Sequence, residues 1–207
     1  MSDKQMILSI GRECGSGGHE IGEKLAEHYG LKFYDRNIID VLAKELDEDP
    51  EAVAKVEERI SGFLPVRRGG FEAKVKDLMN RLNKTDQLFI YEKALIQRMA
   101  ESESFVIVGR GANDTLAGNP NVLRLFIYAP ESFKIPRVRE DYRIEFDSDA
   151  KKKMEQTDKE RREFFEYYTG RVWGGTDHHD LMIDSSLLGI DGTVDLIIQV
   201  ADKKFGR

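Results

Sequence analysis

The sequence predicts an α/β fold built on a parallel sheet, and two kinds of segment lead to this prediction. Three short apolar runs, at residues 6–10, 105–108 and 122–128, have the length and composition of buried strands. Each run is followed closely by glycine or proline, which interrupts a strand. Segments with apolar residues at helical spacing lie between the runs. This alternation of strands and helices is typical of parallel α/β sheets.

The first half of the chain is predicted to open with a strand–loop–helix–strand unit. Apolar residues recur at helical spacing from His19 to Tyr29, and Gly30 supplies a C-terminal stop. Residues 31–34 are a candidate second strand. The other elements expected in this half are helices at 37–46, 50–60 and 85–100 and a loop at 61–70.

The second half is predicted to continue the same alternation of strands and helices, interrupted by a stretch rich in basic residues. A helix is expected at 131–146, kinked or restarted at Pro136. Residues 157–160 have the form of a capping box, which predicts a helix at 158–168. A strand at 181–183 and a helix at 191–201 are the last elements that the sequence predicts.

Composition and charge exclude several classes of protein. The chain has 207 residues, enough to bury a sizeable core in one domain. Its net charge of −6 does not suit a non-specific nucleic-acid binder, which needs a clustered cationic surface. One cysteine cannot form an internal disulfide, and no apolar run approaches the roughly 20 residues of a membrane helix. We therefore expect a cytoplasmic protein that binds neither nucleic-acid polymers nor membranes. The sequence leaves its oligomeric state open.

A glycine-rich segment at 11–19 lies between the first predicted strand and the first predicted helix. Glycines let the backbone curl so that amides point inward, and the helix adds free amides and a partial positive charge of about 0.5 e. This pattern favours a nest for phosphates. The residues expected to form it are Arg12, Gly15, Ser16, Gly17, Gly18 and His19. A tight turn whose glycines serve only close packing is the alternative.

The loop departs from the usual P-loop pattern at its end. When Arg12 is set as the first position, the terminal Gly-Lys-Ser/Thr triplet becomes Gly17-Gly18-His19. The lysine that reaches the phosphates and the hydroxyl that holds Mg²⁺ are therefore both absent. If the loop binds a triphosphate, arginines such as Arg12 must supply the missing charge.

Four motifs follow one another along the chain. They are SIGRECGSGGHEIG at 9–22, KFYDR at 32–36, VGRGA at 108–112, and a segment at 158–189 that opens with DKER and ends with DLMIDSSLLG. Together they resemble the cytidylate kinase-like family, a divergent branch of the nucleoside monophosphate kinases. The resemblance implies a P-loop kinase-like three-layer fold with a parallel five-stranded sheet, in a single domain over 1–207. It also implies an acceptor-binding insert at about 36–85 and a helical lid at about 137–175.

The resemblance also implies roles for individual residues. Gly15 to Gly18 would wrap the phosphates of ATP. Arg36 would bind the acceptor phosphate. Asp158 and Arg161 match a lid pattern in which the aspartate aids nucleotide binding and the arginine reaches the transferring phosphoryl group, although Glu155-Gln156 replaces the Arg-Asp pair that precedes it in the family.

Arg110 corresponds to the arginine of a Gly-Arg-Asp motif near the acceptor, with Gly111 in place of the aspartate. Elementary chemistry supports the same position, because Arg110 directly follows a predicted buried strand, where parallel sheets place their ligands. A guanidinium there suits bidentate contact with a phosphate. An ion pair over the sheet edge is the structural alternative. Asp35 beside Arg36 is a candidate to orient that arginine or to reach Mg²⁺.

Phosphoryl transfer needs positive charge around the transferring group and needs water kept out, and an arginine-rich lid provides both. Arg161 is our first choice for this charge and Arg162 the second. Most arginines of this stretch are expected to be solvated and paired with glutamates at helical spacing. Asp158 would also be favourable simply as a carboxylate in the first turn of a helix.

Two further features invite a functional interpretation. Asp177-His178-His179-Asp180 contains metal-ligating residue types, but adjacent histidines point apart and lack spaced partners, so the sequence identifies no metal ligand here. Cys14 near a helix N-terminus is either a redox-sensitive thiol or a small filler.

The expected function is ATP- and Mg²⁺-dependent phosphoryl transfer to a nucleoside monophosphate, with CMP or dCMP as the acceptor that the resemblance implies. A nucleotide-binding regulatory module without catalysis and a kinase of another small metabolite are the alternatives. The lost lysine and Gly111 motivate the first alternative. The partners expected in all three cases are small molecules.

Overall fold

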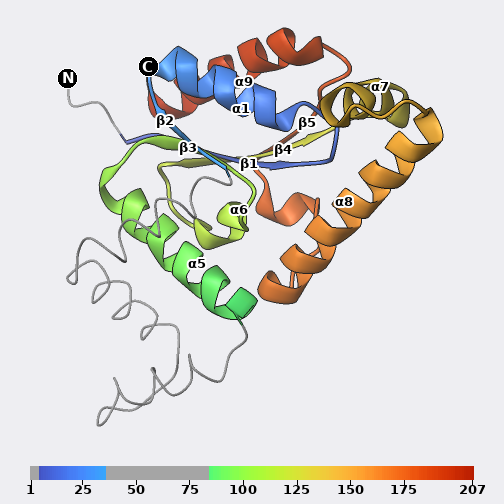
Figure 1. Ribbon diagram of the computed structural model, residues 1–207. Coiled ribbons are helices and arrows are strands. Elements are labelled where there is room, and N and C mark those ends of the chain that lie inside the picture. The colour runs from blue at the N-terminus through green and yellow to red at the C-terminus, as the bar shows by residue number, and fades with distance from the viewer. Residues whose placement is uncertain (1–4, 36–83) are drawn as a thin grey trace. The chain divides into compact units, whose positions relative to one another are not determined.

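The computed structural model describes residues 5–35 and 84–207 (Figure 1). The chain divides into two compact units, one formed by residues 1–34 and 103–207 and the other by residues 35–102. The helices expected at 37–46 and 50–60, the loop at 61–70, Arg36 and nearly all of the predicted insert lie outside the described residues. In the second unit the structure describes helix α5 (Lys84–Ser102), where the sequence predicts a helix at 85–100.

The first unit contains a parallel five-stranded sheet in the order β2-β3-β1-β4-β5, which confirms the predicted fold class. Its strands are β1 (Ile7–Arg12), β2 (Lys32–Tyr34), β3 (Phe105–Val108), β4 (Val122–Tyr128) and β5 (Leu181–Asp184). Strand β1 is central, with β3 and β4 as its neighbours. Because all strands run the same way, the segments that follow β1, β3, β4 and β5 meet at one edge of the sheet.

Helices α1 (Gly18–Tyr29) and α9 (Gly189–Phe205) lie side by side on one face of the sheet (Figure 1). Ile21 and Leu25 of α1 and Ile197 of α9 are fully buried against the strands. Helix α1 ends where Gly30 takes a left-handed conformation, as its sequence predicts. The packing fixes the start of α1, and therefore the loop that precedes it, against the carboxyl end of β1.

Helix α6 (Ala112–Thr115) directly follows the turn after β3, and the sequence analysis did not predict it. Helix α7 (Glu131–Tyr142) follows β4 and runs through Pro136 as one helix. The prediction of a helix to residue 146 was wrong, because Arg143 takes a left-handed conformation and its amide bonds the Glu140 carbonyl oxygen. Proline has no amide hydrogen, so Pro136 removes one internal hydrogen bond from α7.

The largest correction concerns helix α8 (Asp147–Thr169), which begins eleven residues before the predicted start at 158. Thr157 lies inside the helix and does not cap it. Ala150 and Met154 are buried, and together with Phe165 they form one face of the helix. Burial of this face stabilises the polar, lysine-rich first half of α8, whose sequence alone does not predict a helix.

A short 3-10 helix, η1 (Thr176–His178), connects α8 to β5. Within the described residues, no helix combines the length and the apolar character needed to cross a bilayer.

Candidate active site

The loop between β1 and α1 has the backbone of an anion nest. Gly15 and Gly17 have φ angles of 77° and 79°, a left-handed conformation that glycine adopts without strain. Within the described ranges, the backbone amides of Gly15, Gly17 and Gly18 donate no hydrogen bond to another protein group. These amides and the N-terminus of α1 are therefore available to an anion such as a phosphate.

The glycine at position 15 is also required by its surroundings. A Cβ atom there would lie 2.8 Å from the Lys134 carbonyl oxygen and 2.8 Å from Cγ2 of Val138. Both residues belong to α7, so the loop backbone packs directly on this helix. Glycine at this position thus satisfies both the conformation of the loop and its contact with α7, so close packing accounts for Gly15 as well as a nest does.

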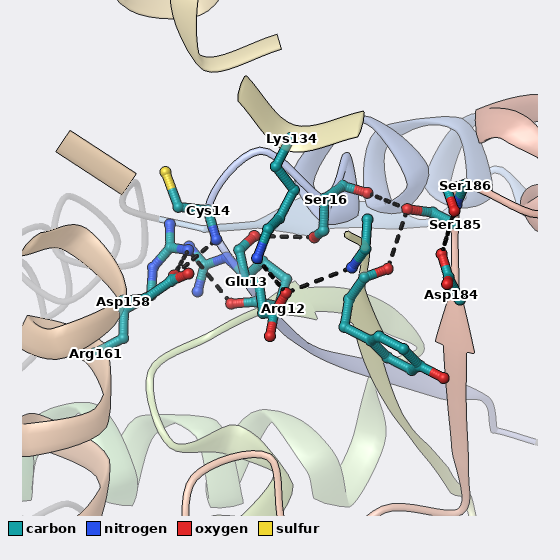
Figure 2. A network of polar contacts seen from close by, with 12 residues as sticks. Arg12, Glu13, Cys14, Ser16, Lys134, Asp158, Arg161, Asp184, Ser185 and Ser186 are labelled. Atoms are coloured by element: carbon teal, nitrogen blue, oxygen red, sulfur yellow. Dashed lines mark hydrogen bonds and ion pairs between the residues drawn. The ribbon is translucent and has the colours of Figure 1, made fainter. Parts of the chain in front are cut away.

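Helix α8 brings a carboxylate and a guanidinium onto the loop (Figure 2). The Cys14 amide donates a hydrogen bond of 2.7 Å to Oδ1 of Asp158. Nη1 of Arg161 lies 3.3 Å from the Arg12 carbonyl oxygen and 3.3 Å from Oδ1 of Asp158. The predicted lid residues Asp158 and Arg161 therefore contact the predicted phosphate loop directly.

The position of these two side chains follows from the buried face of α8. Ala150, Met154, Asp158, Arg161 and Phe165 are separated by three or four residues and so lie on one side of the helix. Ala150 and Met154 pack with Cys14 of the loop and Val138 of α7 in one apolar cluster. The apolar contacts therefore hold the polar pair against the loop.

Burial raises the pKa of Asp158 above its ordinary value, while the Cys14 amide and Arg161 oppose this shift. Its side chain is 13% exposed. The carboxylate is thus poorly hydrated, and the amide and the guanidinium replace part of its lost solvation. Burial also raises the pKa of the Cys14 thiol, which favours the filler interpretation over a reactive thiolate.

Two anchors of the loop were missed by the sequence analysis. Lys134 is buried in α7, and its Nζ lies 2.7 Å from Oε2 of Glu13. The hydroxyl of Ser185, fully buried after β5, donates a hydrogen bond of 2.7 Å to the Ser16 carbonyl oxygen (Figure 2). Ser185 comes directly after a strand, at the edge of the sheet where the loop lies, and that placement was the available sequence signal.

The side chains of Ser16 and His19 are turned away from the role that a P-loop hydroxyl plays. The Ser16 hydroxyl donates to the Glu13 carbonyl oxygen at 2.9 Å, within the loop itself. The His19 ring lies near Phe33, and its Nε2 is 3.3 Å from Oε1 of Glu23 on the same helix. The Ser16 amide also donates to the Glu13 carbonyl oxygen, at 3.4 Å, so neither side chain takes the place of the P-loop hydroxyl and the nest consists of the glycine amides.

Arg110 lies just after the carboxyl end of β3 and has an unusual backbone conformation. Gly109, Arg110 and Gly111 have φ angles of 81°, 57° and 64°, so all three are left-handed. For an arginine this conformation is strained, and such strain concentrates at functional sites. The Gly109 amide bonds the Ile10 carbonyl oxygen of β1 at 2.9 Å, so the turn adjoins the end of the central strand.

The model of the cytidylate kinase-like family matches residues 7–187, which is most of the chain. The chain belongs to the cytidylate kinase-like family. Family membership and the P-loop kinase fold support a kinase of nucleotides or small metabolites. A search of curated proteins finds no match.

The chain is also similar to solved structures. An uncharacterized protein from Eubacterium ventriosum is 30% identical, with 96% of this chain and 99% of that chain covered and a TM-score of 0.69. The structure titled APE1195 is 12% identical over 98% of each chain, with a TM-score of 0.50. Shikimate kinase from Acinetobacter baumannii is 12% identical over 96% of this chain and 93% of that chain, with a TM-score of 0.49.

Not every predicted site residue of this family member lies at the loop. Arg162 is exposed and lies over the Trp173 ring, 5.6 Å from its centroid. Asp35 belongs to the other unit of the chain, and Arg36 lies outside the described residues. The roles of these three residues at the acceptor therefore stay predictions.

The two histidines at 178–179 have structural partners, and only His178 is buried. His178 is 1% exposed and stacks on Phe165 of α8. Nδ2 of Asn113 bonds the Leu125 carbonyl oxygen at 3.1 Å and lies 2.9 Å from Nδ1 of His179. Because that amide nitrogen is a donor, Nδ1 of His179 accepts and the imidazole is neutral. In the described part of the chain, no group of three or more histidine, cysteine or acidic residues could hold a metal ion.

His179 should make folding sensitive to acid. Burial, with His178 and Arg124 nearby, lowers its pKa to about 4 from 6.5. The unfolded chain then binds a proton more readily, so the free energy of unfolding should fall by up to about 3 kcal/mol between pH 6.5 and 4. Urea denaturation across this pH range measures the fall. His179→Gln keeps an acceptor for Asn113 without a titrating ring and should flatten that part of the profile.

Exposed His28 provides the control for this measurement. His28→Gln should leave the difference between pH 6.5 and pH 4 nearly unchanged. An equal flattening in both variants would contradict the assignment to His179.

Proposed function

We propose that this protein transfers the γ-phosphoryl group of ATP to a nucleoside monophosphate, with CMP or dCMP as the foremost acceptor. The observation that carries the proposal is the contact of Asp158 and Arg161 with the backbone of the glycine loop. This contact holds the Arg161 guanidinium against the glycine loop, at the carboxyl edge of the parallel sheet. Membership in the cytidylate kinase-like family supports the nucleotide acceptor.

In this proposal the loop binds the ATP phosphates through main-chain groups. The Gly15, Gly17 and Gly18 amides donate to phosphate oxygens, and the N-terminus of α1 adds a favourable field. Lys134 and Ser185 fix the loop from outside through Glu13 and the Ser16 carbonyl oxygen. The donors are thus held in place before the nucleotide arrives, which lowers the reorganisation that binding requires.

Arg161 supplies positive charge where the transferring phosphoryl group passes. Asp158 orients this guanidinium, since its Oδ1 lies 3.3 Å from Nη1 of Arg161. Helix α8 covers the loop and keeps water from the reaction. Positioning and charge carry most of phosphoryl transfer, so no dedicated general base is assigned.

Mg²⁺ bound together with ATP would neutralise negative charge that develops during the transfer. The Ser16 hydroxyl bonds the Glu13 carbonyl oxygen, and His19 stands where the P-loop pattern places its Ser or Thr hydroxyl. The donor set at the loop therefore does not form a protein site for the ion. We therefore expect phosphates and water to coordinate the ion, and we assign no step of the mechanism to a protein ligand of the ion.

A coupled assay of ADP release tests the proposal with ATP, Mg²⁺ and a panel of nucleoside monophosphates. Turnover that depends on CMP or dCMP is the expected result. Turnover only with hydroxylated metabolites outside the panel would favour a kinase of another small molecule. Calorimetric binding of ATP without turnover on any acceptor would contradict the proposal.

That last outcome defines the second candidate, a nucleotide-binding regulatory module. Two observations favour it: the Cys14 amide is already bonded to Asp158, and Gly18 replaces the usual lysine. We prefer catalysis. Asp158, which bonds the Cys14 amide, also holds the Arg161 guanidinium against the loop.

Arg110 should act on the acceptor rather than on ATP. Arg110→Ala removes charge-assisted hydrogen bonds to a phosphate, which are worth about 1.5–3 kcal/mol together. The KM for the acceptor should therefore rise by about 10- to 100-fold. Steady-state kinetics with each substrate varied in turn measures this effect. A larger rise in the KM for ATP than for the acceptor would place Arg110 in the ATP site instead.

A further inference from the structure

The first and seventh positions of the loop are exchanged relative to the usual P-loop pattern. That pattern has glycine at the first position and lysine at the seventh. This chain has Arg12 at the first and Gly18 at the seventh. A lost lysine alone would leave the site short of charge, whereas the exchange moves a cation from one end of the loop to the other.

The structure gives a steric reason for the exchange. A Cβ atom at Gly18 would lie 2.5 Å from Cβ and 3.1 Å from Cγ of Arg12. Real Cβ atoms do not approach another carbon this closely, so only one of the two positions can carry a long side chain. The stem of Arg12 fills the space that the first atoms of a lysine at position 18 would need.

The guanidinium of Arg12 ends at the neighbouring strand. A Cβ atom at Gly109 would overlap Nη1 of Arg12, and Gly109 has a φ of 81° that favours glycine in any case. Arg12 therefore spans from the end of β1 to the turn after β3, beside Arg110. This position lies at the edge of the sheet where the proposed ATP loop and the proposed acceptor residue meet.

We propose that Arg12 performs the task of the absent P-loop lysine, with its guanidinium binding the β- and γ-phosphates of ATP at the transfer position. The inference rests on the proposed function and adds the residue that supplies the charge. A guanidinium forms two parallel hydrogen bonds to phosphate, so it replaces an ammonium without loss of charge and with more directional contact.

Variants that separate bulk from charge test this proposal. Arg12→Gln keeps most of the stem but removes the charge. It should weaken ATP binding in calorimetry by about 10- to 100-fold and lower kcat. Lys32→Gln is the matched control, because Lys32 begins β2 at the opposite, amino edge of the sheet and pairs with Glu103. It should bind ATP as the wild type does.

The exchange itself can be reversed. Gly18→Lys alone should destabilise the fold, because the new side chain meets Arg12. The double variant Arg12→Gly with Gly18→Lys restores the usual pattern and removes that clash. It should be more stable than Gly18→Lys in thermal unfolding and should bind ATP more tightly than Arg12→Gly.

The outcomes separate this inference from the proposed function. If the wild-type protein binds ATP and phosphorylates an acceptor but Arg12→Gln does both equally well, the inference fails and the proposed function stands. A folded double variant that binds ATP no better than Arg12→Gly would also overturn it. A wild-type protein that does not bind ATP would overturn both.

Discussion

Replacement of Arg161 by alanine should lower acceptor-dependent turnover by about a thousandfold, the lower end of what a transition-state arginine contributes in phosphoryl transfer. The Arg161 guanidinium lies against the Arg12 carbonyl oxygen and Asp158, so it is already held at the loop before any substrate binds. Its loss removes charge that acts mainly in the transition state, and kcat should fall more than the KM for ATP rises. Steady-state kinetics of the coupled reaction gives both values.

The neighbouring Arg162 makes this experiment specific. It belongs to the same helix and carries the same charge, but it lies exposed over the Trp173 ring. Arg162→Ala should therefore reduce turnover far less than Arg161→Ala. Equal losses in the two variants would mean that general charge on the lid, rather than the contact with the loop, is what matters. Thermal unfolding of both variants shows whether either loss reflects the fold.

Gly15→Ala should destabilise the protein by about 2–4 kcal/mol and abolish measurable ATP binding. Part of the cost is the left-handed backbone at φ 77°, which is unfavourable by about 1–2 kcal/mol for alanine. The remainder comes from the contact of the new methyl group with the Lys134 carbonyl oxygen and Val138. Chemical denaturation measures the stability, and calorimetry measures the nucleotide affinity.

Gly30 provides a matched control for the backbone part of this cost. Its φ is 64°, and a Cβ atom there would meet nothing within 4 Å. Gly30→Ala should therefore cost about 1–2 kcal/mol, from the conformation alone. If Gly15→Ala cost no more than Gly30→Ala, the loop would not be packed against α7 as the structure describes.

Under the proposed function, the contact between helix α8 and the loop links stability to catalysis. Cys14 packs with Ala150 and Met154 of α8, while its amide bonds Asp158 of the same helix. One residue of the loop is thus held by apolar contacts and by a poorly hydrated carboxylate together. Changes that loosen this apolar cluster should also move Arg161 away from the phosphates, even though they touch no substrate.

Much of the fold could be predicted from the sequence because its signals are local. The buried strands at 105–108 and 122–128 are continuous apolar runs, and glycine and proline end them. The loop at 11–19 could be identified as a nest because dense glycines, a preceding strand and a following helix are adjacent in the chain. Arg161 and Asp158 were identified through the family motif that contains them.

Helix α8 shows where the local signals fail. The capping-box pattern at 157–160 predicts a helix start, yet the helix begins at Asp147. What decides its start is burial of Ala150 and Met154 against α7 and against Cys14 of the loop, which is distant in the sequence. Helix propensity is a weak preference that tertiary packing overrides.

By itself the sequence determined the parallel α/β architecture, the presence of a glycine loop suited to phosphates and the absence of the usual lysine from that loop. Only the tertiary structure decided that Arg12 fills the space beside Gly18 and that Ser185 and Lys134 anchor the loop. The reason is physical. Strands and glycine turns depend on neighbouring residues, whereas steric exclusion and ion pairing depend on atoms that folding brings together from distant parts of the chain.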